Sequence, residues 1–137
     1  MTYGPPEPPW GYRIPDREPW RIPYDRTVEV AARLAGANLV ELSQGCRRYP
    51  NVLARMLATV IGRRFRARSL SYPEIVRLPG IGWGWYHSNA HGSYRYWLAE
   101  PHDVRERWLF AIRCEAAGLC IARRSQNAAF DQPRRAR

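Results

Sequence analysis

Lysine is absent from this 137-residue sequence, and all 22 of its basic side chains are arginine. Only 12 residues are acidic, so the formal net charge is +10. Each cation of the chain is therefore a permanently charged planar fork, which matches the geometry of phosphate groups and of guanine. A basic face that meets only water is the alternative explanation. The scarcity of acids among the arginines favours a nucleic-acid partner.

Other absences exclude several classes of protein. No stretch approaches the roughly 18 consecutive apolar residues that a membrane-spanning helix needs. The N-terminus lacks the basic, then apolar, then small-residue pattern of a secretory signal. The three cysteines are odd in number and form no CxxC pair, so neither a disulfide framework nor a zinc site is expected. We therefore expect a cytoplasmic, nucleoid-associated protein with reduced thiols.

Catalytic and metal-binding patterns are also missing. No GxxxxGK[ST] phosphate-binding loop occurs, which argues against an ATPase of the P-loop type. His87 and His91 are four residues apart, as zinc ligands on a helix can be, but Ser88 stands where an HExxH motif has glutamate. Cys46 becomes a nucleophile only if folding brings a histidine to it. We expect no enzymatic activity, no metal and no cofactor.

The positive charge is concentrated in the middle of the chain. Residues 1–42 hold five arginines and six acids, a net charge of −1. Residues 43–99 hold nine arginines and a single acid, a net charge of +8. Residues 100–137 hold eight arginines and five acids, a net charge of +3. The central stretch therefore has the electrostatic character of a nucleic-acid surface.

Residues 1–26 contain seven of the twelve prolines, which predicts an extended arm rather than a helix. The arm repeats a short pattern in which Pro-Trp is followed by Arg-Ile-Pro, with Trp10 and Trp20 as its aromatic residues. One interpretation is a docking strip that places these indoles in grooves of a protein partner or a second subunit. The other is an arm that packs on its own domain.

Apolar residues at helical spacing predict a small helical bundle over residues 27–124. A first helix is expected to begin at Thr27 and to end at Gly36 or Asn38, before a short helical turn over 39–42. A basic loop should follow, and then a helix over 51–65. A last helix from residue 102 is expected to end at Gly118, leaving residues 125–137 as a flexible basic tail.

The helix over 51–65 has a predicted apolar stripe, with Arg55 on another face. The stripe consists of Val52, Leu53, Met56, Leu57, Val60 and Ile61. The C-terminal end of this helix is rich in arginine, where cations suit the helix dipole.

Residues 71–98 read as two short helices joined by a glycine-rich turn. The Ser71 hydroxyl can cap the first helix, and Pro73 fits its first turn. Pro79 and Gly80 then end that helix. A second helix that begins at His87 would complete a helix-turn-helix, which lays its second helix in the DNA major groove.

Four segments carry a resemblance to a known family: residues 27–42, Arg47-Arg48 with residues 54–58, residues 70–75, and His87-Ser88-Asn89. In their order and spacing they resemble the C-terminal DNA-binding domain of the bacterial replication initiator DnaA. The resemblance covers residues 27–99, about half of the chain. It implies that Arg47 or Arg48 enters the minor groove, and that the cluster starting at His87 contacts the major groove and the backbone.

This chain departs from that family at three points. The turn over 80–86 is longer, no acidic residue precedes His87, and Asn89 stands where the family has a second hydroxyl. The sequence specificity is therefore expected to differ.

Two other local structures remain open. Arg77 to Gly82 contains an LPGIG pattern that resembles a helix-hairpin-helix, which binds the phosphate backbone through its amides. The aromatic residues of 83–97 alternate as in a β-hairpin, which would remove the recognition helix. That outcome would favour a structural or adaptor protein, of phage type, whose arm docks on a partner.

The sequence as a whole predicts a mostly α-helical protein that binds double-stranded DNA through a helix-turn-helix and regulates transcription or replication. The expected phosphate contacts are Arg47, Arg48, Arg55, Arg64, Arg66, Arg68 and Ser71. The expected base contacts are His87, Ser88, Asn89, His91 and Arg95.

Overall fold

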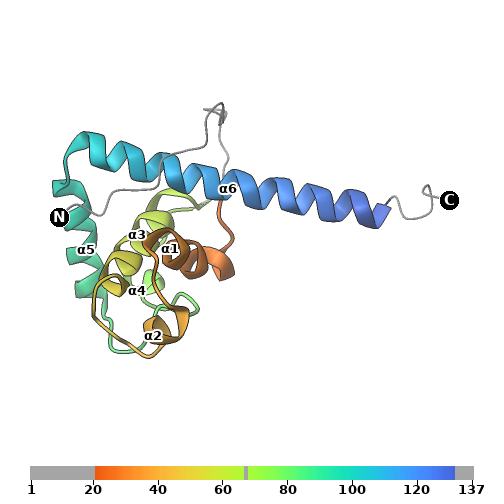
Figure 1. Cartoon of the computed structure of the whole chain (residues 1–137). Coiled ribbons are helices and arrows are strands. Elements are labelled where there is room, and N and C mark those ends of the chain that lie inside the picture. The colour runs from red at the N-terminus through yellow and green to blue at the C-terminus, as the bar shows by residue number, and fades with distance from the viewer. Residues whose placement is uncertain (1–20, 67, 132–137) are drawn as a thin grey trace.

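The computed structural model describes residues 21–66 and 68–131, with side chains through residue 119. Within these residues the chain forms helices and no β-strand (Figure 1). The elements are η1 (Tyr24–Arg26), α1 (Thr27–Ala35), α2 (Leu39–Ser43), α3 (Asn51–Arg64), α4 (Tyr72–Ile75), α5 (His87–Ala99) and α6 (His102–Asp131). The predicted mostly α fold is confirmed. Trp10 and Trp20, the expected docking residues, lie outside the described residues.

Helix α3 is the centre of the bundle, and α1, α4 and α5 pack around it (Figure 1). Within the described side chains, the core gathers residues from α1, α2, α3, α4, α5 and the first half of α6. Its largest fully buried side chains include Trp97, Ile22, Leu42, Leu57, Ile61, Ile75 and Ile112. None of the described helices is long and apolar enough to cross a membrane.

The first helix begins and ends where the sequence predicts. α1 starts at Thr27, and Gly36 closes it in the left-handed conformation at φ +72°. Asn38 has a different role from the one expected, because it starts a helix instead of ending one. Its Oδ1 accepts hydrogen bonds from the backbone N–H groups of Val40 and Glu41, at 2.9 and 3.1 Å, and so caps α2.

The burial pattern of α3 differs from the predicted apolar stripe at two positions, Val52 and Arg55. Val52, expected in the core, is 48% exposed, whereas Arg55, expected on another face, is only 3% exposed. Asn51 and Thr59, four residues to either side of Arg55, are also fully buried. A polar row therefore runs along the inner side of α3 between its apolar residues.

The compact part of the chain begins before the predicted boundary at residue 27. Ile22 is fully buried, and its N–H donates to the Phe65 carbonyl at 3.2 Å. The Ile22 carbonyl in turn accepts from Arg66 Nη1 at 2.9 Å. Residues 21–26 therefore belong to the helical domain, and the extended arm proposed for 1–26 is shorter at this end.

Helix α6 is much longer than predicted, because Gly118 does not end it. The helix continues to Asp131, so residues 125–131 are helical where a flexible tail was expected. Its first half packs on the bundle through Trp108, Leu109 and Ile112, and Glu115 binds Arg33 at 2.7 Å. The second half extends past the other helices (Figure 1).

Candidate nucleic-acid interface

Helix α4 is held at its start by a reciprocal pair of hydrogen bonds. Ser71 Oγ accepts from the Glu74 N–H at 3.3 Å, and Glu74 Oε1 accepts from the Ser71 N–H at 3.0 Å. This capping box confirms Ser71 as the N-cap. Arg68 Nη2 adds an ion pair to Glu74 at 2.8 Å. The N-terminus of α4, the first helix of the expected helix-turn-helix, is therefore stabilised by the side chains of Ser71, Glu74 and Arg68.

The charge of Glu74 should make stability depend on pH. The Ser71 backbone N–H and the Arg68 guanidinium hold the pKa of Glu74 at about 2, below its ordinary 4.5. Because the folded pKa is lower than the unfolded one, the contribution is complete above pH 4.5 and is lost as pH falls towards 2. We expect Glu74→Gln to be less stable than the native chain in urea at pH 6. The difference should shrink steadily as pH falls from 4.5 towards 2.

A second variant checks the origin of that effect. Arg68→Gln removes the ion pair but keeps the capping box, so its pH dependence should lie between those of the native chain and Glu74→Gln. A stability difference that stays constant from pH 6 to pH 2 would show that Glu74 acts through its shape and not through its charge.

The turn between α4 and α5 is built on glycines in the left-handed region. Gly82 has φ +100° and lies directly on the carbonyl oxygen of Leu42, where a Cβ atom would be 2.2 Å away. Gly84 has φ +77° but open space around it, with only Arg47 Nη2 within 4 Å of an added Cβ. The turn therefore passes very close to the end of α2.

Helix α5 begins at His87. This start distinguishes between a helix, a β-hairpin and a helix-hairpin-helix, the local structures that the sequence leaves open. Residues 83–97 form no β-hairpin, since His87–Ala99 is helical. The helix-hairpin-helix interpretation is also not supported, because the second helix starts only at His87 and not directly after Gly82. Ala90 and Trp97 turn into the core. His87, Ser88, His91 and Arg95, four of the expected base contacts, are exposed on α5.

Asn89 occupies a different position from the other predicted base contacts. Its Oδ1 accepts a hydrogen bond from the Tyr86 backbone N–H at 2.9 Å, which closes the first turn of α5. An asparagine that reads adenine needs both its oxygen and its nitrogen for the base. In this conformation one lone pair of the Asn89 oxygen is used within the helix, and Nδ2 is the group that can donate to a ligand.

The basic loop between α2 and α3 lies against the turn that precedes α5. The Nη2 atom of Arg47 donates to the carbonyl oxygen of Gly84. Arg48 makes an exposed ion pair with Glu41 at 3.0 Å, and its Nε donates to Cys46 Sγ at 3.4 Å. The neighbouring Arg48 lowers the pKa of the Cys46 thiol, mainly through hydrogen bonding. The two arginines assigned to one loop thus have different local partners.

Arg55 is not the surface phosphate contact that the sequence suggests. It is buried, and its three nitrogens donate to the carbonyl oxygens of Ile81, Cys46 and Leu42, at 3.1, 2.7 and 3.1 Å. These carbonyls belong to the turn between α4 and α5, the basic loop and α2. Burial, together with the nearby charge of Arg47, lowers the pKa of the Arg55 guanidinium. One side chain therefore ties the two expected DNA-reading segments together.

The other edge of α5 packs on α4 through aromatic contacts. The rings of Tyr72 and His91 meet edge to face, with centroids 5.1 Å apart. The Arg63 guanidinium lies over Tyr72 at 4.8 Å and over Tyr94 at 5.5 Å. His91 therefore stands beside a cation on this edge, and α5 is bordered by arginines on both sides.

The arginines near the end of α3 divide into two kinds. Arg64 and Arg68 are exposed, although Arg68 shares its charge with Glu74. Arg66 is half-buried and binds the protein itself, through the Ile22 carbonyl and the ring of Tyr24 at 5.5 Å. Arg66 thus serves the N-terminal segment, and Arg64 is the better candidate for a phosphate contact at this end.

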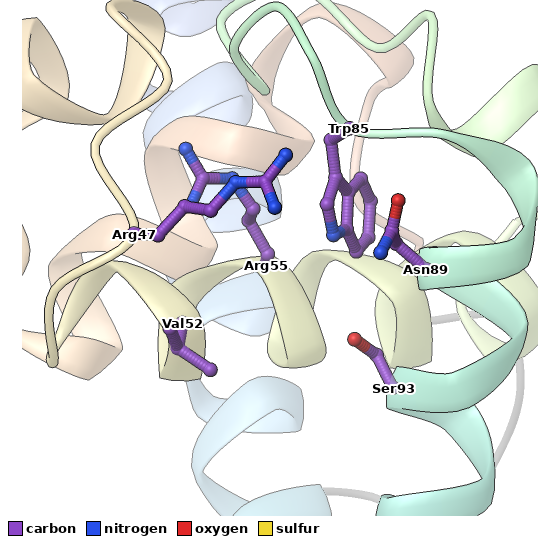
Figure 2. A pocket seen from close by; sticks show the side chains of 6 residues that line it. All are labelled: Arg47, Val52, Arg55, Trp85, Asn89 and Ser93. Carbon is purple, nitrogen blue, oxygen red and sulfur yellow. The ribbon is translucent and has the colours of Figure 1, made fainter.

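A cleft lies between the basic loop and α5, with a volume of about 120 Å³. Arg47 and Val52 stand on one side, Asn89 and Ser93 on the other, and Trp85 between them, with Arg55 behind (Figure 2). The structure thus brings Arg47 and Asn89 together, while Arg64 and Arg68 lie at the opposite end of α3. The described residues hold no group of three or more His, Cys, Asp or Glu side chains that suits a metal.

Sequence reasoning missed four residues of this region: Arg63, Tyr72, Trp85 and Ser93. Ser93 had a usable signal, because it follows Asn89 by four residues and so shares its edge of a helix. The positions of Trp85 and Tyr72 depend on tertiary packing. Comparison with protein-family models, with curated proteins and with solved structures finds no match to this chain.

Proposed function

We propose that this chain binds duplex DNA by placing the exposed face of α5 in the major groove, as a regulator of transcription or replication. The observation that carries the proposal is the setting of α5. The helix presents His87, Ser88, His91 and Arg95 to solvent. One edge borders the basic loop at Arg47, and the other borders Arg63 through Tyr72.

This arrangement suits a groove-binding helix for a physical reason. A helix in the major groove has a phosphate backbone on each side, so cations are useful along both edges. The central exposed face can then meet base edges with imidazole, hydroxyl and guanidinium groups, of which Arg95 is suited to guanine. The resemblance to the DnaA domain points to the same placement of α5 and of the basic loop. The adaptor alternative depends on Trp10 and Trp20, outside the described residues.

Binding to duplex DNA is expected to weaken steeply as salt rises. Arg47, Arg48, Arg64 and Arg68 are exposed in the region proposed to face DNA. Neutralising about four phosphates gives a slope of about −3.6 in log K against log salt, or roughly a 150-fold loss between 50 and 200 mM. Fluorescence anisotropy with random and selected duplexes measures this slope. Arg64→Gln should reduce the slope by about 0.9.

A matched variant tests whether the effect belongs to this surface. Arg107→Gln removes one charge from α6, where Arg107 stands 3.9 Å from Asp103, and should leave the slope unchanged. His87→Ala should weaken a selected site more than random DNA, because a base contact discriminates between sequences and a phosphate contact does not. Absence of binding to both duplexes at about 0.15 M salt would contradict the proposed function.

A further inference from the structure

The cleft beside α5 is lined by hydrogen-bond donors. Arg47 can only donate. Asn89 has its oxygen engaged by the Tyr86 N–H, so its Nδ2 is the group left to face a ligand. Figure 2 shows this nitrogen and the Ser93 hydroxyl directed towards the cleft. No carboxylate is among the residues that line the cleft.

Among the described residues, no acid forms an ion pair with the charge behind the cleft. Arg55 lies at the back, 3% exposed, and all its hydrogen bonds in the described region go to backbone carbonyls. None of the ion pairs among the described residues includes Arg55 or Arg47. Buried charges in proteins are normally paired. Two guanidinium groups therefore face one small cleft with no acid in it, an environment in which an anion is stabilised.

We propose that this cleft binds a single phosphate group, held by Arg47, Asn89 Nδ2 and Ser93 Oγ above the fixed charge of Arg55. The inference rests on the proposed function, since in a DNA complex the group would be one phosphodiester of the backbone beside α5. The side chains of Val52 and Trp85 complete the lining of the cleft with apolar surface. Asn89 then positions the backbone and does not read a base. Arg48 is left as the residue for the minor groove.

The substitution Asn89→Asp distinguishes an effect on the phosphate site from an effect on the stability of α5. The carboxylate can still accept the Tyr86 N–H, and a negative charge near a helix N-terminus is favourable, so α5 should remain at least as stable. In the cleft, however, the variant replaces a donor by an anion. We expect its affinity for duplex DNA to fall at least about tenfold below that of a charge-matched control. Thermal unfolding confirms that the fold is kept.

The charge-matched control is Gln44→Glu. Gln44 is exposed at the end of α2, close in sequence to the basic loop, but does not line the cleft. It adds the same negative charge, so it reports the loss that comes from net charge alone. Ser93→Ala adds a neutral test, because it removes one hydroxyl and should weaken binding without altering charge. Equal affinities of Asn89→Asp and Gln44→Glu would overturn the phosphate site.

Titration with inorganic phosphate at constant ionic strength identifies the ligand independently of DNA. The NMR signals of the Asn89 side-chain amide and of Ser93 should shift saturably in the native chain and not in Asn89→Asp. A duplex with one methylphosphonate at each position in turn tests the DNA source, since neutralising the seated phosphate should weaken the native chain and have little effect on Asn89→Asp. A response to phosphate without DNA binding would support the site and contradict the proposed function. DNA binding without any response of these groups, or no response to either ligand, would overturn the site.

Discussion

Replacement of Arg55 by methionine is expected to lower the free energy of unfolding by about 3 kcal/mol, because three hydrogen bonds to backbone carbonyl oxygens are lost at roughly 1 kcal/mol each. The carbonyls are those of Ile81, Cys46 and Leu42. Methionine fills a similar volume, so the change removes donors without a large cavity. Relief from burying a charge offsets part of the loss. Urea unfolding, followed by circular dichroism, measures the difference.

The same variant should loosen the link between the basic loop and the turn before α5. Hydrogen exchange is expected to speed up in residues 44–49 and 80–86, while α1 keeps its protection. Arg33→Met is the matched control, because Arg33 is an arginine with two ion pairs on the surface, to Glu29 and Glu115. Its loss should stay below about 1 kcal/mol. Similar losses from both variants would contradict the structural role of Arg55.

Gly82→Ala is expected to cost about 3–5 kcal/mol, the sum of backbone strain and a lost buried hydrogen bond. The strain arises because φ is +100°. An added Cβ would also lie 2.2 Å from the Leu42 carbonyl oxygen and 3.0 Å from Arg55 Nη2. That oxygen is an acceptor of Arg55, so neither neighbour can move without breaking the contact between them. Thermal and urea unfolding both report the loss.

Gly84→Ala supplies the comparison two residues along the same turn. Its φ is +77°, but the only atom within 4 Å of an added Cβ is Arg47 Nη2, the end of a flexible side chain at 3.8 Å. Its cost should be the strain alone, about 1–2 kcal/mol. If both alanine variants lost the same stability, the close approach of the turn to α2 would be incorrect.

Much of the helical framework could be predicted from local signals. Ser71 and Glu74 have the spacing of a capping box, and the capped helix is present. Thr27 and Gly36 mark the two ends of α1 as expected. The prediction that α6 ends at Gly118 was wrong. A single glycine in a helix costs only about 1 kcal/mol, and Gly118 stands in open space. Local sequence does not show whether neighbouring turns make up for that cost.

The β-hairpin alternative arose from alternating aromatic residues. In the structure these residues lie in different elements and have different surroundings. Trp83 is 77% exposed and stands in the glycine-rich turn. Tyr94 and Tyr96 are both in α5, where Tyr94 packs beside Tyr72 and Tyr96 is 75% exposed. Alternation in the sequence was therefore a coincidence of a turn followed by a helix. Glycines with positive φ at 82 and 84 interrupt any strand at that point.

The candidate site was predicted in part. The exposed face of α5 was found from its polar residues, and the basic loop from its arginines. Arg55 was misplaced, because an arginine among surface arginines gives no local sign that tertiary carbonyls surround it. The buried positions of Asn51 and Thr59, on the same row of α3, come from packing on both sides of the helix. Such burial is a property of the assembled bundle and not of the helix alone.

The hydrogen bonds of Arg55 use only backbone oxygens of the segments that it joins. The exposed side chains of the basic loop and of the turn can therefore change without disturbing the joint, provided that Gly82 and the buried Ile81 are kept. The joint is therefore separate from the surface that we propose to meet DNA. Libraries that vary the exposed Arg47, Arg48 and Trp83 should accordingly yield folded proteins, in which the proposed DNA contacts can be altered one at a time.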